Sequence, residues 1–379
     1  MYSRELTPII LSSLKKYKIV SLLGPRQSGK TTLAKMVGEK FDYYNMEDLS
    51  FRSRVSEDPK SFFSNVKNDI IIDEVQEWPE ILSYIQILTD DENWKHRFIL
   101  TGSNSLTLSD NISQSLAGRV RIFQILPLSL RELPLEKRPQ TISEALFKGL
   151  YPRIYWQDLD PQEWISSYVQ TYIQKDVRQI IQLENLMTFD RFLRLLAGRV
   201  GQVLNYSSLA NDVGVSVPTI KSWISILEAS YVVYLLMPHH RNFNKRIIKS
   251  PKLYFYDTGI VSFLLRIHSP AILDDHPLRG YIFKNWVVGE KIKRFINRGQ
   301  ISPYYFWRDQ HGHEVDLAED LGKHLYLTEI KSALTFNSEF VQNILWLNEL
   351  QKQNVGEVIY GGEEEFVFKN INIRSWKNI

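Results

Sequence analysis

The chain has 379 residues, of which 44% are hydrophobic and 23% charged, and this composition excludes a disordered, collagen-like or coiled-coil protein. It has no cysteine, which excludes a disulfide framework, a thiolate zinc site, an iron–sulfur cluster and a cysteine nucleophile. No apolar run approaches the ~18 residues of a membrane helix, and residues 1–11 do not resemble a secretory signal. We therefore expect a cytoplasmic protein of about two or three domains, without membrane contact.

Positive charge is concentrated in one segment of the chain. Residues 191–256 carry nine Lys or Arg and two acids, a net charge of +7, whereas the rest of the chain carries 37 basic and 41 acidic residues. A basic module in a nearly neutral chain indicates a polyanionic partner such as DNA. A solvated basic face is the alternative.

Residues 1–140 have the pattern of alternating short strands and helices. The apolar runs Lys18–Leu23, Asp69–Asp73 and Phe98–Thr101 predict strands, and residues 31–41 predict an amphipathic helix after the first of them. Short apolar strands joined by helices predict a parallel sheet that is covered on both faces. The fold class is therefore α/β for this domain, and a proline cluster within residues 126–140 predicts its end.

A glycine-containing loop follows the first predicted strand. It consists of Gly24, Pro25, Arg26, Gln27, Ser28, Gly29, Lys30 and Thr31, with Thr32 next in the helix. This is the full G-x-x-x-x-G-K-T pattern in a strand–loop–helix context. Glycines let the backbone N–H groups point at a phosphate, and the helix adds its positive N-terminal end. The loop predicts a phosphate site in which Lys30 reaches the β- and γ-phosphates and Thr31 offers its hydroxyl to Mg²⁺.

Two adjacent acids end the second predicted strand. Asp73 is expected to hold the hydrated Mg²⁺, and Glu74 is expected to polarise the attacking water. An apolar strand that ends in acids is weak evidence alone. Combined with the phosphate loop, it is strong evidence for this site.

The third predicted strand ends in Thr101, Gly102, Ser103 and Asn104. Asn104 or Ser103 could hold the attacking water, and a turn-forming asparagine is the alternative. Arg119 could be an arginine finger that stabilises charge in the transition state, or an ordinary surface arginine. The sequence does not distinguish a finger acting in its own site from one acting in a neighbouring copy, so an oligomer is possible.

These motifs, together with residues 115–119, resemble the AAA-type P-loop ATPases. More narrowly, they and the segments 168–178 and 204–210 resemble a prokaryotic family that joins such a domain to a C-terminal domain of unknown function. The resemblance covers nearly the whole chain. It implies ATP binding and hydrolysis, and it implies little about the biological purpose.

The basic segment has the pattern of a small DNA-binding unit. After a helical region at 141–190, residues 206–211 and 219–229 predict two helices, and residues 231–236 and 252–256 predict a strand pair. Helix, turn, helix and basic hairpin are typical of a winged helix. The predicted DNA contacts are Ser216, Thr219, Lys221 and Ser222 on the second helix, and Arg241, Lys245, Arg246 and Lys249 in the hairpin.

Such contacts favour largely non-specific DNA binding, because Lys221 is the only charged residue among the four on the second helix. A winged helix that serves internal packing or protein contacts is the alternative.

The last segment, residues 257–379, begins with a predicted helix near residues 281–297. Glu290 shares a helix face with apolar residues at 283, 286 and 287, so its carboxylate is expected to point inward. An inward carboxylate is costly unless it is paired or bound to a metal ion.

Further acids follow on two predicted strands. Asp316 precedes Glu329 by thirteen residues, and Glu329 and Lys331 lie two apart on one strand face. Together with Glu290, they resemble the E…D…E-x-K core of PD-(D/E)XK nucleases. This resemblance implies Mg²⁺ held by Glu290, Asp316 and Glu329, with Lys331 orienting the water. A nuclease fold without activity, or strands joined by salt bridges, is the alternative.

The predicted domains are an ATPase domain at 1–140, a helical linker at 141–190, a winged helix at 191–256 and a nuclease-like domain at 257–379. The leading hypothesis is an ATPase coupled to DNA binding and metal-dependent DNA processing. The alternatives are an ATP-gated DNA-binding or signalling switch with an inactive nuclease-like domain, and an ATPase that acts on protein partners.

Overall fold

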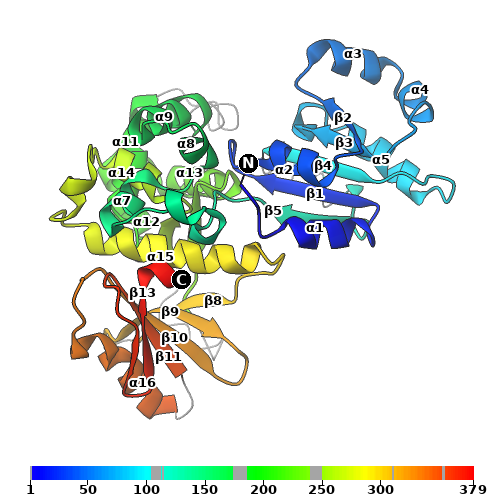
Figure 1. The fold of residues 1–379 in the computed structure, drawn as a ribbon. Helices are drawn as coiled ribbons and strands as arrows, with labels where there is room; N and C mark the ends of the chain where they lie inside the picture. Colours follow the sequence, from blue (N-terminus) through cyan, green and yellow to red (C-terminus); the bar gives the residue numbers. More distant parts are fainter. Residues whose placement is uncertain are drawn as a thin grey trace.

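The computed structural model describes residues 2–103, 112, 115–173, 186–239, 250–309, 311–351 and 355–379. Two separate sheets and a helical body between them make up the chain (Figure 1). The N-terminal α/β domain lies at one side of the helical body, and the C-terminal sheet lies on the far side of the long helix α15 (Arg279–Ile296).

The N-terminal sheet is parallel, which confirms the predicted α/β fold class. Its strands are arranged in the order β2 (Asp42–Asn45), β3 (Ile70–Asp73), β4 (Phe98–Ser103), β1 (Ile19–Gly24) and β5 (Val120–Gln124). Alternate residues of β1 face opposite sides of the sheet. Val20 packs with α1 (Thr7–Leu14) and α2 (Lys30–Val37), whereas Ile19 packs with α5 (Ile81–Asp90) and with the region of α3 (Leu49–Glu57) and α4 (Pro59–Ser64). Helices therefore cover both faces.

The helical body follows the N-terminal sheet. Its elements are α7 (Ile142–Lys148), α8 (Pro152–Trp156), α9 (Pro161–Tyr168), a π-helical turn (Val169–Ile173), α11 (Leu186–Ala197), α12 (Tyr206–Val213), α13 (Val217–Ala229), the antiparallel pair β6 (Val233–Leu236) and β7 (Lys252–Phe255), and α14 (Thr258–Leu264). Asn205 and Ser216 cap α12 and α13 through their side chains, which fixes where both helices begin.

The C-terminal sheet has six strands in the order β12-β13-β11-β10-β9-β8. After α15, its elements are β8 (Tyr304–Arg308), β9 (Glu314–Asp320), β10 (Leu325–Lys331), α16 (Gln342–Gln351), β11 (Val355–Tyr360), β12 (Phe366–Phe368) and β13 (Ile371–Ser375). Strands β8, β9 and β10 pair antiparallel, and β11 pairs parallel with both β10 and β13.

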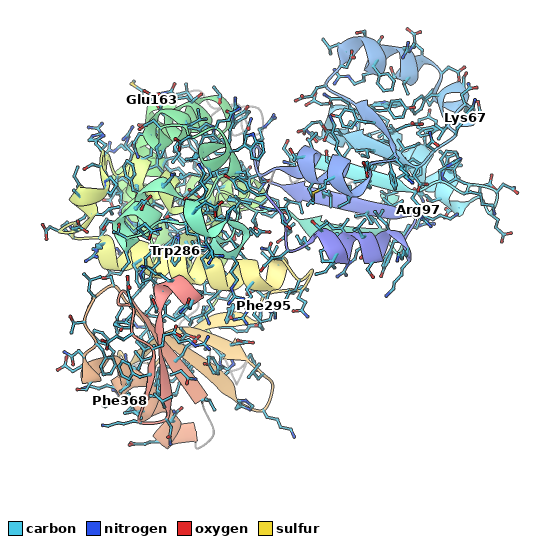
Figure 2. All side chains as sticks on the ribbon, viewed as in Figure 1. Lys67, Arg97, Glu163, Trp286, Phe295 and Phe368 are labelled. Carbon is cyan, nitrogen blue, oxygen red and sulfur yellow. The ribbon has the colours of Figure 1, made fainter. Side chains whose placement is uncertain are left out.

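Helix α15 is buried along both of its sides. Trp286 packs edge-on against Trp376 with ring centroids 5.5 Å apart, and Phe295 packs against Tyr304 at 5.3 Å. Figure 2 shows Trp286 and Phe295 on this helix, between the helical body and the C-terminal sheet. One hydrophobic core runs from Leu126 to Ile379 through this helix, separately from the cores of the N-terminal sheet. Among the described residues, no helix combines the length and the apolar character needed to cross a membrane.

Candidate functional site

The phosphate loop connects β1 to α2, as the sequence predicts. Gly29 has a φ of 94°, a left-handed conformation, and a Cβ at this position would meet no atom within 4 Å. A Cβ on Gly24 would lie 2.1 Å from the carbonyl oxygen of Ile125. The first glycine is therefore required by close packing, and the second by backbone conformation.

Lys30 lies inside this loop and is 5% exposed. Its Nζ donates to the carbonyl oxygens of Gly24 and Pro25 at 3.1 and 2.8 Å. The buried Ser28 Oγ has no hydrogen-bond partner among the described residues. The buried Lys30 ammonium and the Ser28 hydroxyl lie in the same loop as Gly29, where the backbone is open to a ligand. These groups fit a phosphate group of ATP.

Asp73 ends β3 beside the loop and is 3% exposed. Thr31 Oγ1 donates to its two carboxylate oxygens at 2.9 and 3.0 Å, and Tyr43 Oη donates at 2.6 Å. Thr101 Oγ1 also donates to this carboxylate. Burial and the Asp73 carboxylate hold the pKa of Tyr43 far above its usual value, so the phenol remains a donor. The adjoining Thr31 and Asp73 oxygens are hard ligands that fit Mg²⁺.

Glu74 follows Asp73 in the left-handed conformation, with a φ of 52°. Its Oε2 accepts from Gln76 Nε2 at 2.5 Å and from the backbone N–H and hydroxyl of Ser103 at 3.4 and 3.5 Å. Of the two candidates at the tip of β4, Ser103 therefore contacts the predicted water-polarising group. Asn104 lies outside the described residues. Sequence reasoning missed Gln76, although an amide two residues after the acid is a local signal.

A cavity of about 480 Å³ extends from the phosphate loop toward α8. Beyond the loop its walls include Tyr2, Arg153 and Trp156, and the Tyr2 and Trp156 rings meet edge-on with centroids 5.8 Å apart. Trp156 is 60% exposed. An exposed aromatic ring beside a phosphate site offers a stacking surface for a nucleobase. Sequence reasoning missed both aromatic residues, because nothing local links positions so far apart in the chain.

We expect Trp156→Ala to weaken ATP binding about tenfold, because base–aromatic stacking contributes roughly 1–3 kcal/mol. Isothermal calorimetry with ATP measures this change. Inorganic tripolyphosphate has no base, so its affinity should be the same for the variant and the wild type. An equal loss for both ligands, or no loss for ATP, would contradict a base-stacking role.

Arg119 lies at the end of the sheet opposite to the phosphate loop. It directly precedes β5, where Val120 pairs with Ile19, while the loop begins after Gly24 at the other end of β1. Five strand residues separate the two ends by about 16 Å. Arg119 instead forms a bidentate pair with Asp90 at 2.6 and 2.8 Å. A finger role for Arg119 would therefore require a neighbouring copy of the chain.

The predicted DNA-contacting residues of α13 lie at its surface. Ser216, Lys221 and Ser222 are exposed and Thr219 is half-buried. The Ser216 and Thr219 hydroxyls are 2.7 Å apart at the helix N-terminus, where Ser216 is the cap. The hairpin residues Arg241, Lys245, Arg246 and Lys249 lie outside the described residues.

Three of the four predicted nuclease residues converge in the C-terminal sheet. Asp316 and Glu329 are each 2% exposed on neighbouring strands, and Lys331 Nζ lies 3.0 Å from Glu329 Oε2. A lysine that the sequence analysis did not consider joins them, because Lys284 of α15 places its Nζ 2.5 Å from Asp316 Oδ1.

The structure corrects the position of Glu290. Its carboxylate is buried, as predicted, but it accepts from the backbone N–H of Leu130 at 2.7 Å and from Lys293 Nζ at 3.0 Å. Six residues separate Glu290 from Lys284, which places the two side chains about 120° apart around the helix. Glu290 therefore faces the segment after the N-terminal sheet and not Asp316.

The pKa values of the two clustered carboxyl groups, Asp316 and Glu329, are shifted in opposite directions. Burial opposes ionisation of Asp316, but the ammonium groups of Lys284, Lys252 and Lys331 outweigh it and hold its pKa well below the usual range. Burial and the Asp316 charge raise the pKa of Glu329 to about 8. Ionisation is therefore more favourable at Asp316 than at Glu329.

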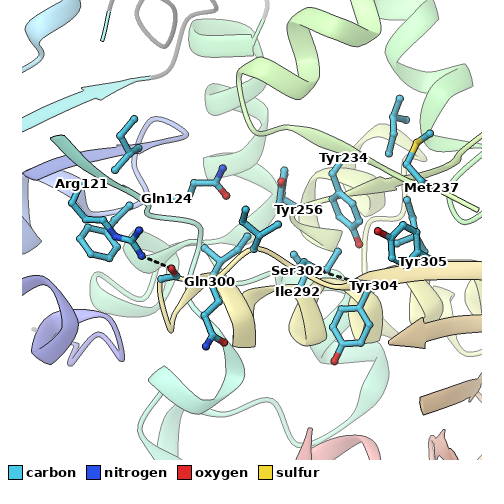
Figure 3. A pocket seen from close by; sticks show the side chains of 17 residues that line it. Arg121, Gln124, Tyr234, Met237, Tyr256, Ile292, Gln300, Ser302, Tyr304 and Tyr305 are labelled. Carbon is cyan, nitrogen blue, oxygen red and sulfur yellow. Dashed lines mark hydrogen bonds between the residues drawn. The ribbon is translucent and has the colours of Figure 1, made fainter. Parts of the chain in front are cut away.

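A second cavity, of about 550 Å³, lies where the three parts of the chain meet (Figure 3). Strand β5, strand β6, Tyr256 just after β7, and the end of α15 with β8 supply its walls. Arg121 Nη2 donates to the carbonyl oxygen of Gly299 at 2.7 Å across it. This cavity is separate from the one at the phosphate loop, and its walls come from the N-terminal sheet, the helical body and the C-terminal domain.

The phosphate loop, the acids at the end of β3 and the strand order define the N-terminal domain as an AAA-type P-loop ATPase domain. Residues 16–134 match the family model of an AAA domain. Residues 139–271 and 279–378 match two domains of unknown function, DUF8612 and DUF4143.

The chain is 30% identical to the Mycobacterium tuberculosis protein Rv2008c over 370 residues, which cover 96% of this chain and 81% of that protein. It belongs to the family of that protein. A Methanocaldococcus jannaschii protein, MJ1637, is 24% identical over 72% of this chain and 67% of its own length.

Solved structures are more distantly similar. A Walker-type ATPase of Pyrococcus abyssi has 16% identity and a TM-score of 0.47, over 70% of this chain and 96% of its own. The RuvB Holliday junction branch migration motor of Thermotoga maritima has 17% identity and a TM-score of 0.29, over 62% of this chain and 89% of its own.

Proposed function

We propose that this protein is an ATP-driven switch that binds DNA through residues 191–256 and changes that binding with its nucleotide state. One observation carries the proposal, which is that the phosphate loop contacts the helical body. Gln27 Nε2 donates to Tyr172 Oη at 3.1 Å, and the Arg26 guanidinium lies 5.3 Å from the centroid of the Tyr172 ring. A nucleotide that rearranges this loop would thereby act on the helical body.

The groups at the loop have separate roles in the proposed hydrolysis. Lys30 holds the terminal phosphates of ATP, and Thr31 and Asp73 would hold Mg²⁺, which neutralises charge on the phosphates when bound. Glu74 orients and polarises the attacking water, and Ser103 and Gln76 position its carboxylate. Arg119 would complete the site of a neighbouring copy in an oligomer.

The DNA-binding part of the proposal depends on charge and on the order of elements. Helices α11, α12 and α13 followed by the pair β6–β7 support a winged helix, and residues 191–256 carry a net charge of +7. The exposed Lys221 and the basic hairpin would meet phosphates, with little preference among sequences.

The C-terminal domain is assigned a secondary role in this proposal. Its order of α15, β8, β9, β10, α16 and β11, with Asp316, Glu329 and Lys331 together, supports a PD-(D/E)XK-like fold. The positions of Glu290 and Lys284 favour an inactive domain over metal-dependent DNA processing. In this proposal the protein acts as an ATPase and a DNA-binding switch, and its C-terminal domain does not cleave DNA.

Tyr172→Ala is the variant that tests the switch. We expect wild-type affinity for a short fluorescent duplex to fall steeply with salt and to change about threefold or more on adding a non-hydrolysable ATP analogue. Tyr172→Ala should bind both ligands and lose this nucleotide response, because it removes both contacts to the loop. Tyr172→Phe, which keeps the ring, separates the hydrogen bond from the cation–π contact. Fluorescence anisotropy measures each affinity.

Tyr17→Phe, at a partly exposed tyrosine of the N-terminal domain, is the matched control and should behave as wild type. Equal nucleotide responses in wild type and Tyr172→Ala would contradict coupling through Tyr172. Absence of salt-dependent binding to any nucleic acid would contradict the DNA-binding proposal and favour an ATPase that acts on protein partners.

A further inference from the structure

The acidic cluster of the C-terminal sheet already contains positive charge. Lys284 Nζ lies 2.5 Å from Asp316 Oδ1, and the other Asp316 oxygen accepts from the backbone N–H of Ile330 at 3.0 Å. Asp316 is 2% exposed. Both oxygens of this carboxylate are therefore occupied by donors from the protein itself.

The second carboxyl group is held in the same way. Glu329 Oε2 lies 3.0 Å from Lys331 Nζ, and Oε1 accepts from Asn343 Nδ2 at 3.2 Å. Glu329 is also 2% exposed. A metal ion would have to displace these donors before it could reach the oxygens of either residue.

The side chains of the cluster do not suit the binding of a divalent cation. Mg²⁺ prefers several oxygen ligands in octahedral geometry, and an ammonium group in the same space repels it. In the part of the chain that the structure describes, no group of three or more His, Cys, Asp or Glu could hold a metal ion. Glu290, the acid expected to complete the set, instead binds Lys293 and the backbone of Leu130.

We propose that the Lys284 ammonium replaces a divalent metal ion in this cluster, so that the C-terminal domain folds without a metal. Lys284 reaches Asp316 from α15, the helix on which the expected third acid lies, and is itself three-quarters buried, with a side chain 23% exposed. The cluster then balances its acids with Lys284 and Lys331. The domain therefore does not carry out metal-dependent cleavage of phosphodiesters.

Lys284→Met tests this proposal in the nucleotide-free full chain. The variant keeps the apolar stem and removes the ammonium, which leaves Asp316 buried without its cation. We expect the melting temperature to fall by about 5 °C or more without metal and to recover by at least half on adding Mn²⁺. The reference protein, which retains Lys284, should show no such shift with Mn²⁺.

Lys293→Met is the matched control, because Lys293 is also a buried lysine of α15 that pairs with a carboxylate, Glu290. It should lose stability without recovering in Mn²⁺. In a second variant, Lys284→Glu, uptake of one Mn²⁺ is expected by electron paramagnetic resonance, and the added change Asp316→Asn should abolish it. All proteins carry Asp73→Asn to remove the metal ligand at the phosphate loop.

Two results would overturn the proposal. One is Mn²⁺ uptake by the protein that retains Lys284, if Asp316→Asn removes that uptake. The other is a folded Lys284→Met or Lys284→Glu protein that neither binds Mn²⁺ nor is stabilised by it.

Discussion

Lys30→Ala should weaken ATP binding by about 100-fold or more. The Lys30 ammonium is buried within the phosphate loop, where it contacts two loop carbonyl oxygens and is placed for the terminal phosphates. Hydrogen bonds to charged groups contribute roughly 1.5–3 kcal/mol, and 100-fold in affinity corresponds to about 2.7 kcal/mol. Isothermal calorimetry with ATP and Mg²⁺ measures the loss.

Lys40→Ala removes an exposed lysine just after α2 and should leave ATP affinity unchanged. Because Lys30 also contacts the loop carbonyl groups, thermal melting must show that Lys30→Ala remains folded. A folded Lys30→Ala protein with wild-type affinity would exclude this loop as the ATP site.

Glu74→Gln should leave ATP affinity within about twofold of wild type and slow hydrolysis by about 100-fold or more. The substitution keeps the shape of the side chain and removes the charge that polarises water, a role that contributes roughly 10²–10⁴-fold. Single-turnover hydrolysis at saturating ATP isolates the chemical step from product release.

Glu77→Gln is the control for this variant, since Glu77 lies three residues further on and pairs with Arg52 at the surface. It should hydrolyse ATP at the wild-type rate. Unchanged turnover in Glu74→Gln would assign the water-polarising role to another group.

The phosphate site was predictable because its chemistry is local in sequence. Eight consecutive residues form the loop, Asp73 is the last residue of a strand whose residues are all buried, and Glu74 directly follows it. Strands β1, β4 and β3 run parallel and side by side in that order, so the carboxyl ends of β1 and β3 lie at the same edge of the sheet. The short strands β2 and β5 were not predicted, because their residues are mostly half-buried and lack a continuous apolar run.

The partners of the charged residues on α15 were not predictable from helical periodicity. Glu290 is buried, as its phase indicates, yet both sides of this helix are covered, so burial does not define a direction. Lys284 is a charged residue that a helical pattern assigns to solvent, and its partner Asp316 is 32 residues away. Such a pairing depends on the sheet that packs against the helix.

Contacts between distant segments were missed for the same reason. Tyr2 and Trp156 meet at the nucleotide cavity, and Tyr172 meets Gln27 beside the loop. The residues of each pair are far apart in the sequence, and neither a periodic pattern nor a motif links them. The domain boundaries given above remain predictions.

Helix α15 joins the two halves of the chain through polar contacts on several sides. Lys284 binds Asp316 and Lys291 binds Glu357 of the C-terminal sheet, while Glu290 binds the backbone of Leu130 and Lys293 that of Leu128. A truncated protein that starts at residue 257 would lack the partners at 128 and 130 and would expose the apolar side of the helix to water. A cut near residue 126, where the shared core begins, keeps every one of these contacts within one piece, so it is the better place to divide the gene for expression in two parts.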